Sequence, residues 1–277
     1  MRRFPFVLLL AAVPGLAVAA DGCKFTAQRD FDVDAAGLRN ATFKLGASDL
    51  HIEGVPGLAK VEVRARACAS DQDWLAGLTV DQQRSGDVLT VTANTERNTG
   101  WHWFESSYAW IELRVRVPAE LAIATDGGSA DVDARGLASL DFSAGSGDLE
   151  ADRIAGALTT SAGSGDIRAD DVGSVEVRRT GSGDITLRNV RGDARVARAG
   201  SADLRFEQVG GNVVVERVGS GDVTAEHVQR DVTIGSIGSG DIDVSEIGGN
   251  LTVRAKGSGD VHQSGVRGTV SLPVERD

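Results

Sequence analysis

The four-residue motif Gly-Ser-Gly-Asp, or a close variant of it, occurs eight times in this chain, each time followed by Leu, Ile or Val. Its aspartates are Asp131, Asp148, Asp166, Asp184, Asp203, Asp222, Asp241 and Asp260. Successive copies are separated by 17 to 19 residues. A repeat of this length and regularity indicates one small structural unit that stacks on copies of itself.

Within each repeat, apolar residues alternate with polar ones in two short runs. In one copy Ile185 and Leu187 mark the first run, and Ala194 and Val196 mark the second. A period of two is typical of strands that bury one face. Two strands and two turns per unit predict stacked coils, and the general rule for crossovers between parallel strands favours a right-handed coil. The sequence therefore predicts an all-β fold, a right-handed parallel β-helix (β-solenoid) with coils of 17–19 residues.

The chain is expected to have three parts. Residues 1–20 combine a basic start, the apolar run 6–12 and the sequence Ala17-Val18-Ala19, which together are typical of a secretory signal peptide. Residues 21–125 alternate less regularly and are expected to form a β-rich N-terminal region of irregular first coils that caps the solenoid. Residues 126–277 are expected to form the regular solenoid repeats.

The charge balance limits the choice of partners. The formal net charge is −11, and it becomes −13 when residues 1–20 are removed, because that segment contains two arginines and no acidic residue. Such a charge argues against nucleic acid as a partner.

The apolar run at the start is too short to span a bilayer and no second candidate follows it. We therefore expect no transmembrane segment and a periplasmic or extracellular location.

The chain contains only two cysteines, Cys23 and Cys68. Two thiols in an exported chain predict one disulfide, which would contribute about 4 kcal/mol to stability in the loop-entropy model. The alternative is that Cys23 is a lipid-modified first residue of the mature chain. Asp21 argues against that alternative, because such signals need small neutral residues before the cysteine.

The repeated aspartates have two interpretations. Each carboxylate can accept backbone N–H groups of its own turn, while the neighbouring glycines supply the positive φ of a tight corner. Alternatively, the stacked carboxylates form a ladder that binds cations such as calcium. That ladder would consist of Asp148, Asp166, Asp184, Asp222, Asp241 and Asp260. The spacing differs from the nine-residue steps of calcium-binding β-rolls, so we favour the turn.

One aromatic segment stands apart from the repeats. It contains Trp101, Trp103, Tyr108 and Trp110. Clustered aromatic side chains on an exported chain can stack on sugar rings or contact a protein partner, which makes these four residues candidates for ligand binding. The alternative is that the segment is an apolar lid over the end of the core.

No catalytic or cofactor-binding motif is evident. The sequence has no nucleophile elbow, its Gly-Ser-Gly corners lack the third glycine of a dinucleotide fingerprint, and its four histidines have no zinc-ligand spacing. The best enzyme hypothesis is a polysaccharide lyase or hydrolase built on a β-helix, yet the turns across residues 126–272 are too short to wall a cleft. We expect no enzymatic activity, no cofactor and no metal.

Six intact corners carry a resemblance to a known family, and they lie at 145–148, 163–166, 181–184, 219–222, 238–241 and 257–260. A degenerate copy of the motif at 46–49 and a strand that ends at Pro118 also fit the pattern of that family. With these features the chain resembles a bacterial putative adhesin family of unknown function with Gly-Ser-Gly-Asp β-strand repeats, related to the head GIN domains of autotransporter adhesins. The resemblance implies a β-solenoid exported to the cell envelope, and it supplies no catalytic residues.

These observations combine into one prediction about function. The chain is expected to be an exported, non-enzymatic β-solenoid that acts as an adhesin-like binding or scaffold protein of the cell envelope. Its expected partner is a glycan or an envelope protein. The edge of the last coil, near residues 261–272, is the expected surface for self-association.

Overall fold

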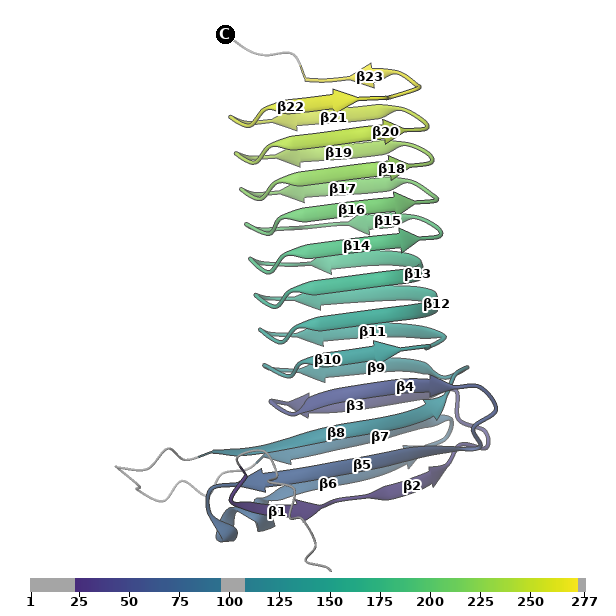
Figure 1. Cartoon of the computed structure of the whole chain (residues 1–277), viewed down its shortest axis with the longest axis vertical. Helices are drawn as coiled ribbons and strands as arrows, with labels where there is room; N and C mark the ends of the chain where they lie inside the picture. Colours follow the sequence, from purple (N-terminus) through teal and green to yellow (C-terminus); the bar gives the residue numbers. More distant parts are fainter. Residues whose placement is uncertain (1–22, 96–107, 274–277) are drawn as a thin grey trace, which may run out of the picture.

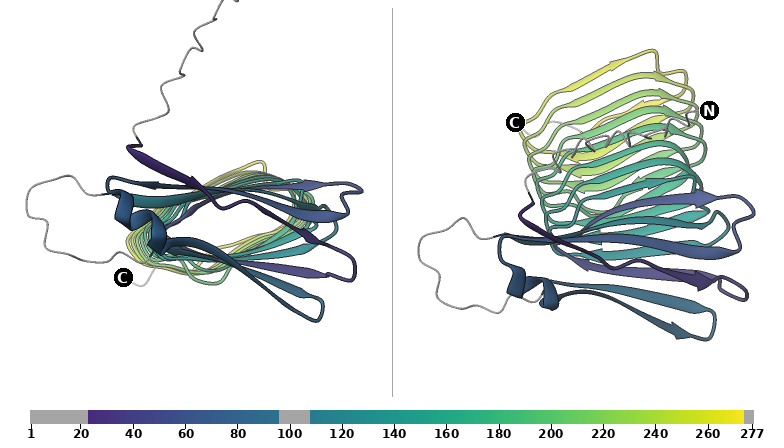
Figure 2. Two further views of the ribbon diagram at one scale, coloured as in Figure 1. Left: turned by 90° about the horizontal axis from the view of Figure 1, so that it is seen from below. Right: turned by 60° about the horizontal axis from the view of Figure 1, so that its bottom comes forward.

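The computed structural model describes residues 23–95 and 108–273, and the predicted signal peptide lies outside them. In the described residues, 23 strands and one short 3-10 helix, η1 (Gln72–Gly77), build an all-β fold. Figure 1 shows coils stacked as a rod, and the view along the rod in Figure 2 shows that each coil is flattened, so that two sheets face each other. The predicted β-solenoid is confirmed.

Sheet one contains the first strand of each coil, and its members pair with one another in parallel. In spatial order its members are β8 (Ala109–Pro118), β4 (Asp49–Val55), β10 (Val132–Arg135), β12 (Leu149–Ala162), β13 (Ile167–Arg179), β14 (Ile185–Val190), β16 (Leu204–Val209), β18 (Val223–Val228), β20 (Ile242–Ile247) and β22 (Val261–Ser264).

Sheet two contains the second strand of each coil and is also parallel. Its members are β7 (Val88–Thr95), β3 (Asn40–Gly46), β9 (Ala122–Gly127), β11 (Ser139–Ala144), the second halves of β12 and β13, β15 (Ala194–Val196), β17 (Val213–Val218), β19 (Val232–Ile237), β21 (Leu251–Lys256) and β23 (Val270–Ser271). The strands β12 and β13 are long enough to run through both sheets.

The register between rungs lines up the inward side chains as columns. One column in sheet one consists of Leu149, Ile167, Ile185, Leu204, Val223 and Ile242, all of them buried. Burial of one such side chain contributes about 1.5–3 kcal/mol before the loss of chain entropy. Because a single rung cannot cover its own inward face, each coil depends on its two neighbours for stability.

Antiparallel strands close the N-terminal end of the rod. Strand β5 (Lys60–Ala69) pairs antiparallel with β8, with β1 (Phe25–Gln28) and with β2 (Phe31–Asp34), and β6 (Leu78–Ser85) pairs antiparallel with β7. The strands β3 and β4 lie between β7 and β8 on one side and β9 and β10 on the other. The predicted domain boundary at residue 125 falls inside β9 and stays a prediction.

The predicted disulfide is confirmed. Cys23 is bonded to Cys68 near the end of β5, with the two Cα atoms 5.8 Å apart. The bond fastens the start of the described chain to the antiparallel sheet. Because the Cys23 sulfur is engaged in this bond, it is not available for attachment of a lipid.

Candidate functional site

The aspartates of the Gly-Ser-Gly-Asp corners form a continuous hydrogen-bonded ladder. These corners, which precede the strands of sheet one, are the turns on the left of the rod in Figure 1. The Oδ1 atom of each aspartate accepts the backbone N–H of the aspartate one rung further on, at 2.8–3.2 Å. We call this set the aspartate ladder; it consists of Asp49, Asp131, Asp148, Asp166, Asp184, Asp203, Asp222, Asp241 and Asp260. The expectation that each carboxylate caps its own turn is therefore wrong, since it caps the next one.

The corner glycines also differ from expectation. None of the positive φ values in the described chain belongs to a glycine of the six intact corners. Instead these glycines allow neighbouring rungs to approach closely, since a Cβ atom added at Gly165 would lie 1.9 Å from the carbonyl oxygen of Gly147. The first glycine of the corner is present in all eight copies, and a Cβ atom added at Gly163 would lie 2.3 Å from the carbonyl oxygen of Gly145. The third position is alanine in two copies, at Ala130 and Ala202. Glycine at the first position therefore serves the stacking of coils, and not the turn's own dihedral angles.

The geometry leaves the cation hypothesis for the aspartate ladder untested. One oxygen of each carboxylate from Asp49 to Asp241 is already engaged by a backbone N–H. Across residues 23–95 and 108–273, no cluster of three or more His, Cys, Asp or Glu side chains has an arrangement that could hold a metal ion. The ladder is thus first a device that fixes the register of the rungs.

The opposite corner carries a second ladder, in which acid and amide alternate. Its members are Asp193, Asn212, Asp231 and Asn250, and the backbone N–H of Thr269 ends the row. Each side-chain oxygen again accepts the backbone N–H of the next residue in the row, at 2.7–3.3 Å. The two asparagines also donate through Nδ2 to the preceding aspartate, at 3.0 and 3.1 Å. We call this set the alternating ladder.

Beside the alternating ladder, six side chains project from left-handed backbone. We call them the left-handed ridge: Arg153, Asp171, Asn189, Gln208, His227 and Glu246, with φ between 51° and 59°. Gly136 and Gly265 occupy the same position at the two ends of the row. A left-handed residue other than glycine costs about 1–2 kcal/mol, less for Asn and Asp. Sequence reasoning missed the ridge, although each member lies five residues after a corner aspartate.

Only part of the aromatic segment falls within the described chain. Trp101 and Trp103 lie outside it. The Tyr108 hydroxyl accepts the backbone N–H of Lys24 at 3.0 Å, and the Arg66 guanidinium lies 5.2 Å from the centre of the Trp110 ring. Tyr108 and Trp110 therefore contact the N-terminal sheet of their own chain. Their role in ligand binding stays a prediction.

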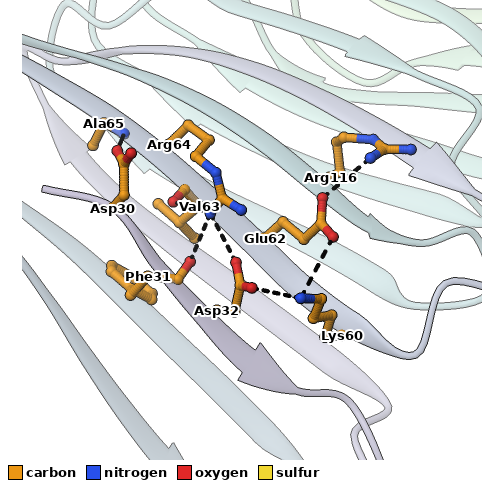
Figure 3. A network of polar contacts seen from close by, with 9 residues as sticks. All are labelled: Asp30, Phe31, Asp32, Lys60, Glu62, Val63, Arg64, Ala65 and Arg116. Carbon is orange, nitrogen blue, oxygen red and sulfur yellow. Dashed lines mark hydrogen bonds and ion pairs between the residues drawn. The ribbon is translucent and has the colours of Figure 1, made fainter. Parts of the chain in front are cut away.

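The outer face of the N-terminal sheet carries a network of charges, drawn in Figure 3. The Asp32 carboxylate accepts hydrogen bonds from Lys60 Nζ at 2.6 Å and from Arg64 Nη1 at 2.7 Å. These two bonds lower the pKa of Asp32 below its usual value. Because the network is exposed to solvent, salt screens it and its effect on stability is small.

A neighbouring carboxylate, Glu112, is surrounded by basic groups. Partial burial raises its pKa, but the hydrogen bond from Arg114 and the charges of Arg114, Arg66 and His51 outweigh burial, so that the net shift of the pKa is downward. Glu112 lines a hollow of about 240 Å³ together with Gln28, Arg64, Arg66 and Arg114. Glu112 pairs with Arg66 and Arg114, and Arg64 pairs with Asp32, so the hollow is lined by a structural ion-pair cluster.

Comparison with known proteins agrees with this fold. A family model described as Toastrack DUF4097 matches residues 60–272. No curated protein sequence matches the chain. No helix in the described ranges is long and apolar enough to cross a bilayer.

The solved structures that match the chain are distant from it in sequence. A putative adhesin from Parabacteroides distasonis is 12% identical with a TM-score of 0.49, and the match covers 87% of this chain and 97% of that one. A putative adhesin from Parabacteroides merdae is 13% identical with a TM-score of 0.45, covering 88% and 97%. A putative lipid binding protein from Parabacteroides distasonis is 13% identical with a TM-score of 0.47, covering 91% and 98%.

Proposed function

The chain belongs to the Toastrack DUF4097 family, and from this premise we propose that it is an exported, non-enzymatic β-solenoid that binds a glycan or a protein of the cell envelope, as an adhesin or a scaffold. One observation carries the proposal. Hydrogen-bonding side chains recur at matching positions of successive rungs, on both corners of the rod. Rows of equivalent groups at the rung spacing suit ligands that are themselves repetitive.

The proposed location outside the cytoplasm draws on two features. Disulfides persist in oxidising compartments, and Cys23 and Cys68 are joined. Residues 1–20 have the composition of a secretory signal peptide. An envelope location would bring the rod into contact with surface glycans and with other exported proteins. The relation to head GIN domains belongs to the same proposal.

The last coil is the proposed surface for self-association. Within the described chain, β22 pairs only with β20, and β23 pairs only with β21. Val270 and Leu272 are 38% and 44% exposed. An open edge of this kind readily accepts another strand, so two copies docked tail to tail would cover it. Sedimentation would test this: Val270→Lys should shift a self-associating population toward the monomer.

A capture experiment tests the proposal as a whole. The mature chain, residues 21–277, would be immobilised and exposed to envelope extract, and in parallel applied to a glycan array. We expect selective retention of an envelope glycan or protein, which a reduced and unfolded sample does not retain. Retention of nothing in either assay would contradict the proposal. Release of reducing ends from polysaccharides would instead establish the enzyme alternative.

A further inference from the structure

A polar groove runs beside the left-handed ridge, along the axis of the rod. It consists of two adjoining hollows of about 490 and 430 Å³ that share His227 and Gln229. The ridge forms one wall, and the buried side chains of Val190, Val209 and Val228 form the floor. We infer that this groove binds an extended polysaccharide, with one disaccharide for every two rungs. The inference rests on the proposed function, because it names the site and the glycan class through which the rod would bind.

The wall opposite the ridge has a period of two rungs. Its successive positions are occupied by Arg191, Gly210, Gln229, Gly248 and Arg267. One hollow therefore opens where Gly210 has no side chain, and the other opens where Gly248 has none. Two rungs correspond to about 9.6 Å. This is close to the length of a disaccharide in an extended β-1,4-linked chain, so equivalent sugars would meet equivalent hollows.

The groups that face the groove suit hydroxyl ligands. The amides of Gln208 and Gln229 have no hydrogen-bond partner among the described residues, and each amide can both donate and accept. His227 Nε2 lies 3.1 Å from Glu246 Oε2, and Arg191 pairs with Asp171. Arg267 lines the same hollow as Glu246, so the groove is lined by two arginines and two carboxylates. Sugar hydroxyls, which donate and accept, match this lining better than an anion does.

The backbone of the groove argues against a peptide ligand. A peptide that extends a sheet pairs with free backbone N–H and C=O groups. Here the N–H groups of Gly210, Gln229 and Gly248 donate to carbonyls of the preceding rung, at 2.8–2.9 Å. Binding must therefore proceed through side chains, as it does for carbohydrates.

The ridge itself also favours a ligand. Glycine at Gly136 and Gly265 builds the same left-handed corner without strain. The rungs between them nevertheless carry polar side chains at this position, and those of Asp171, Asn189, Gln208, His227 and Glu246 line the two hollows. A corner with only a structural role would be better served by glycine at every rung.

The test uses the mature chain with defined hexasaccharides in titration calorimetry. Cellohexaose and chitohexaose are extended β-1,4-linked probes, and maltohexaose, with its coiled α-linked path, is the control. We expect binding of at least one extended hexasaccharide and none of maltohexaose. The double variant Gln208→Gly/His227→Gly removes part of the ridge wall but keeps left-handed backbone. It should lose at least about tenfold in affinity while its melting temperature rises by about 2–4 °C per substitution.

Arg153→Gly is the matched control, because Arg153 belongs to the same ridge and lines neither hollow. It should raise the melting temperature in the same way and leave affinity unchanged. The inference is overturned if neither extended hexasaccharide binds, or if the double variant binds as well as the wild type. Envelope capture that survives in the double variant would leave the proposed function intact and reject only this groove. Failure of the wild type in envelope capture and on the array would reject the proposed function as well.

Discussion

The aspartate ladder places a carboxylate in every rung from Asp49 to Asp260, whereas the alternating ladder exchanges acid for amide at each step. Both ladders hold the same kind of backbone N–H with a side-chain oxygen, at 2.8–3.2 Å in the first and 2.7–3.3 Å in the second. An amide oxygen is therefore sufficient to fix the register of a rung. The negative charge of the aspartate ladder exceeds what the fold requires.

The excess charge has a physical cost. Carboxylates about 4.8 Å apart repel one another, and the alternating ladder avoids this by placing a neutral amide between two acids. Asn212 and Asn250 also gain a second hydrogen bond to the preceding aspartate through Nδ2. The comparison thus separates two roles of the corner aspartates, the capping of the next rung and the display of a line of charge.

The largest effect should come from closing the space between stacked corners. Gly163→Ala would place a Cβ atom 2.3 Å from the Gly145 carbonyl oxygen, so that the two rungs would have to shift apart. We expect a loss of about 2–4 kcal/mol in the free energy of unfolding, measured by urea denaturation. At the opposite corner, a Cβ atom added by Gly192→Ala would lie 2.8 Å from the Gly173 carbonyl oxygen. This substitution should therefore lower the free energy of unfolding by less than half as much. Equal costs would show that the two corners are packed alike.

Removal of a ladder oxygen should have the next largest effect. Asp184→Ala leaves the N–H of Asp203 without its side-chain acceptor and should cost about 1 kcal/mol. At the alternating ladder Asp231→Ala removes the acceptor for both donors of Asn250 and should cost somewhat more. Urea denaturation measures both. If Asp184→Ala left the free energy of unfolding unchanged, water would replace the carboxylate as acceptor, and the ladder would not set the register of the rungs.

A smaller change should follow when charge is removed and the oxygens are kept. The triple variant Asp184→Asn/Asp203→Asn/Asp222→Asn retains the capping acceptors, and its free energy of unfolding should rise by about 0.3–1 kcal/mol at low ionic strength. The gain should shrink in 1 M salt, because exposed charges are screened there. Calcium titration separates the two interpretations of the ladder. A rise in the wild-type melting temperature with calcium, absent in the variant, would establish the cation ladder in place of a purely structural one.

The sequence contained most of the fold but little of the corner geometry. Period-two alternation and the regular return of Gly-Ser-Gly-Asp predict strands and stacked coils, because both depend on the burial of columns such as Ile185, Leu204 and Val223. The interleaving of β3 and β4 between later strands was not predictable, since those pairings join segments that are not neighbours in the chain.

The left-handed ridge shows why a site of this kind escapes sequence reasoning. Its members include Arg, Asp, Asn, Gln, His and Glu, so no residue type repeats. Only Gly136 and Gly265, at the same offset from a corner aspartate, indicate the left-handed position. The sequence also did not show that each corner aspartate caps the next rung. That partner depends on how neighbouring rungs are aligned, and not on the turn itself.

The smallest expected effect concerns Asp49, which begins the aspartate ladder. Partial burial raises its pKa; the hydrogen bond from the Asp131 N–H opposes the rise, and the charge of Asp131 adds to it. A carboxyl whose pKa is higher in the folded state destabilises the fold when ionised, and this penalty disappears as the pH falls below its unfolded pKa. Asp49→Asn should therefore raise the melting temperature at pH 7 and leave it unchanged near pH 3.

Asp32 supplies a control of opposite sign for this pH dependence. Lys60 and Arg64 lower its pKa, so its ionised form stabilises the fold above the unfolded pKa and that contribution is lost as the pH falls through the folded pKa. Asp32→Asn should slightly lower the melting temperature at pH 7 and have no effect at low pH. If Asp49→Asn and Asp32→Asn shift the melting temperature at pH 7 in the same direction, burial does not determine the pKa of Asp49. The first rung of the aspartate ladder would then be as well solvated as the others.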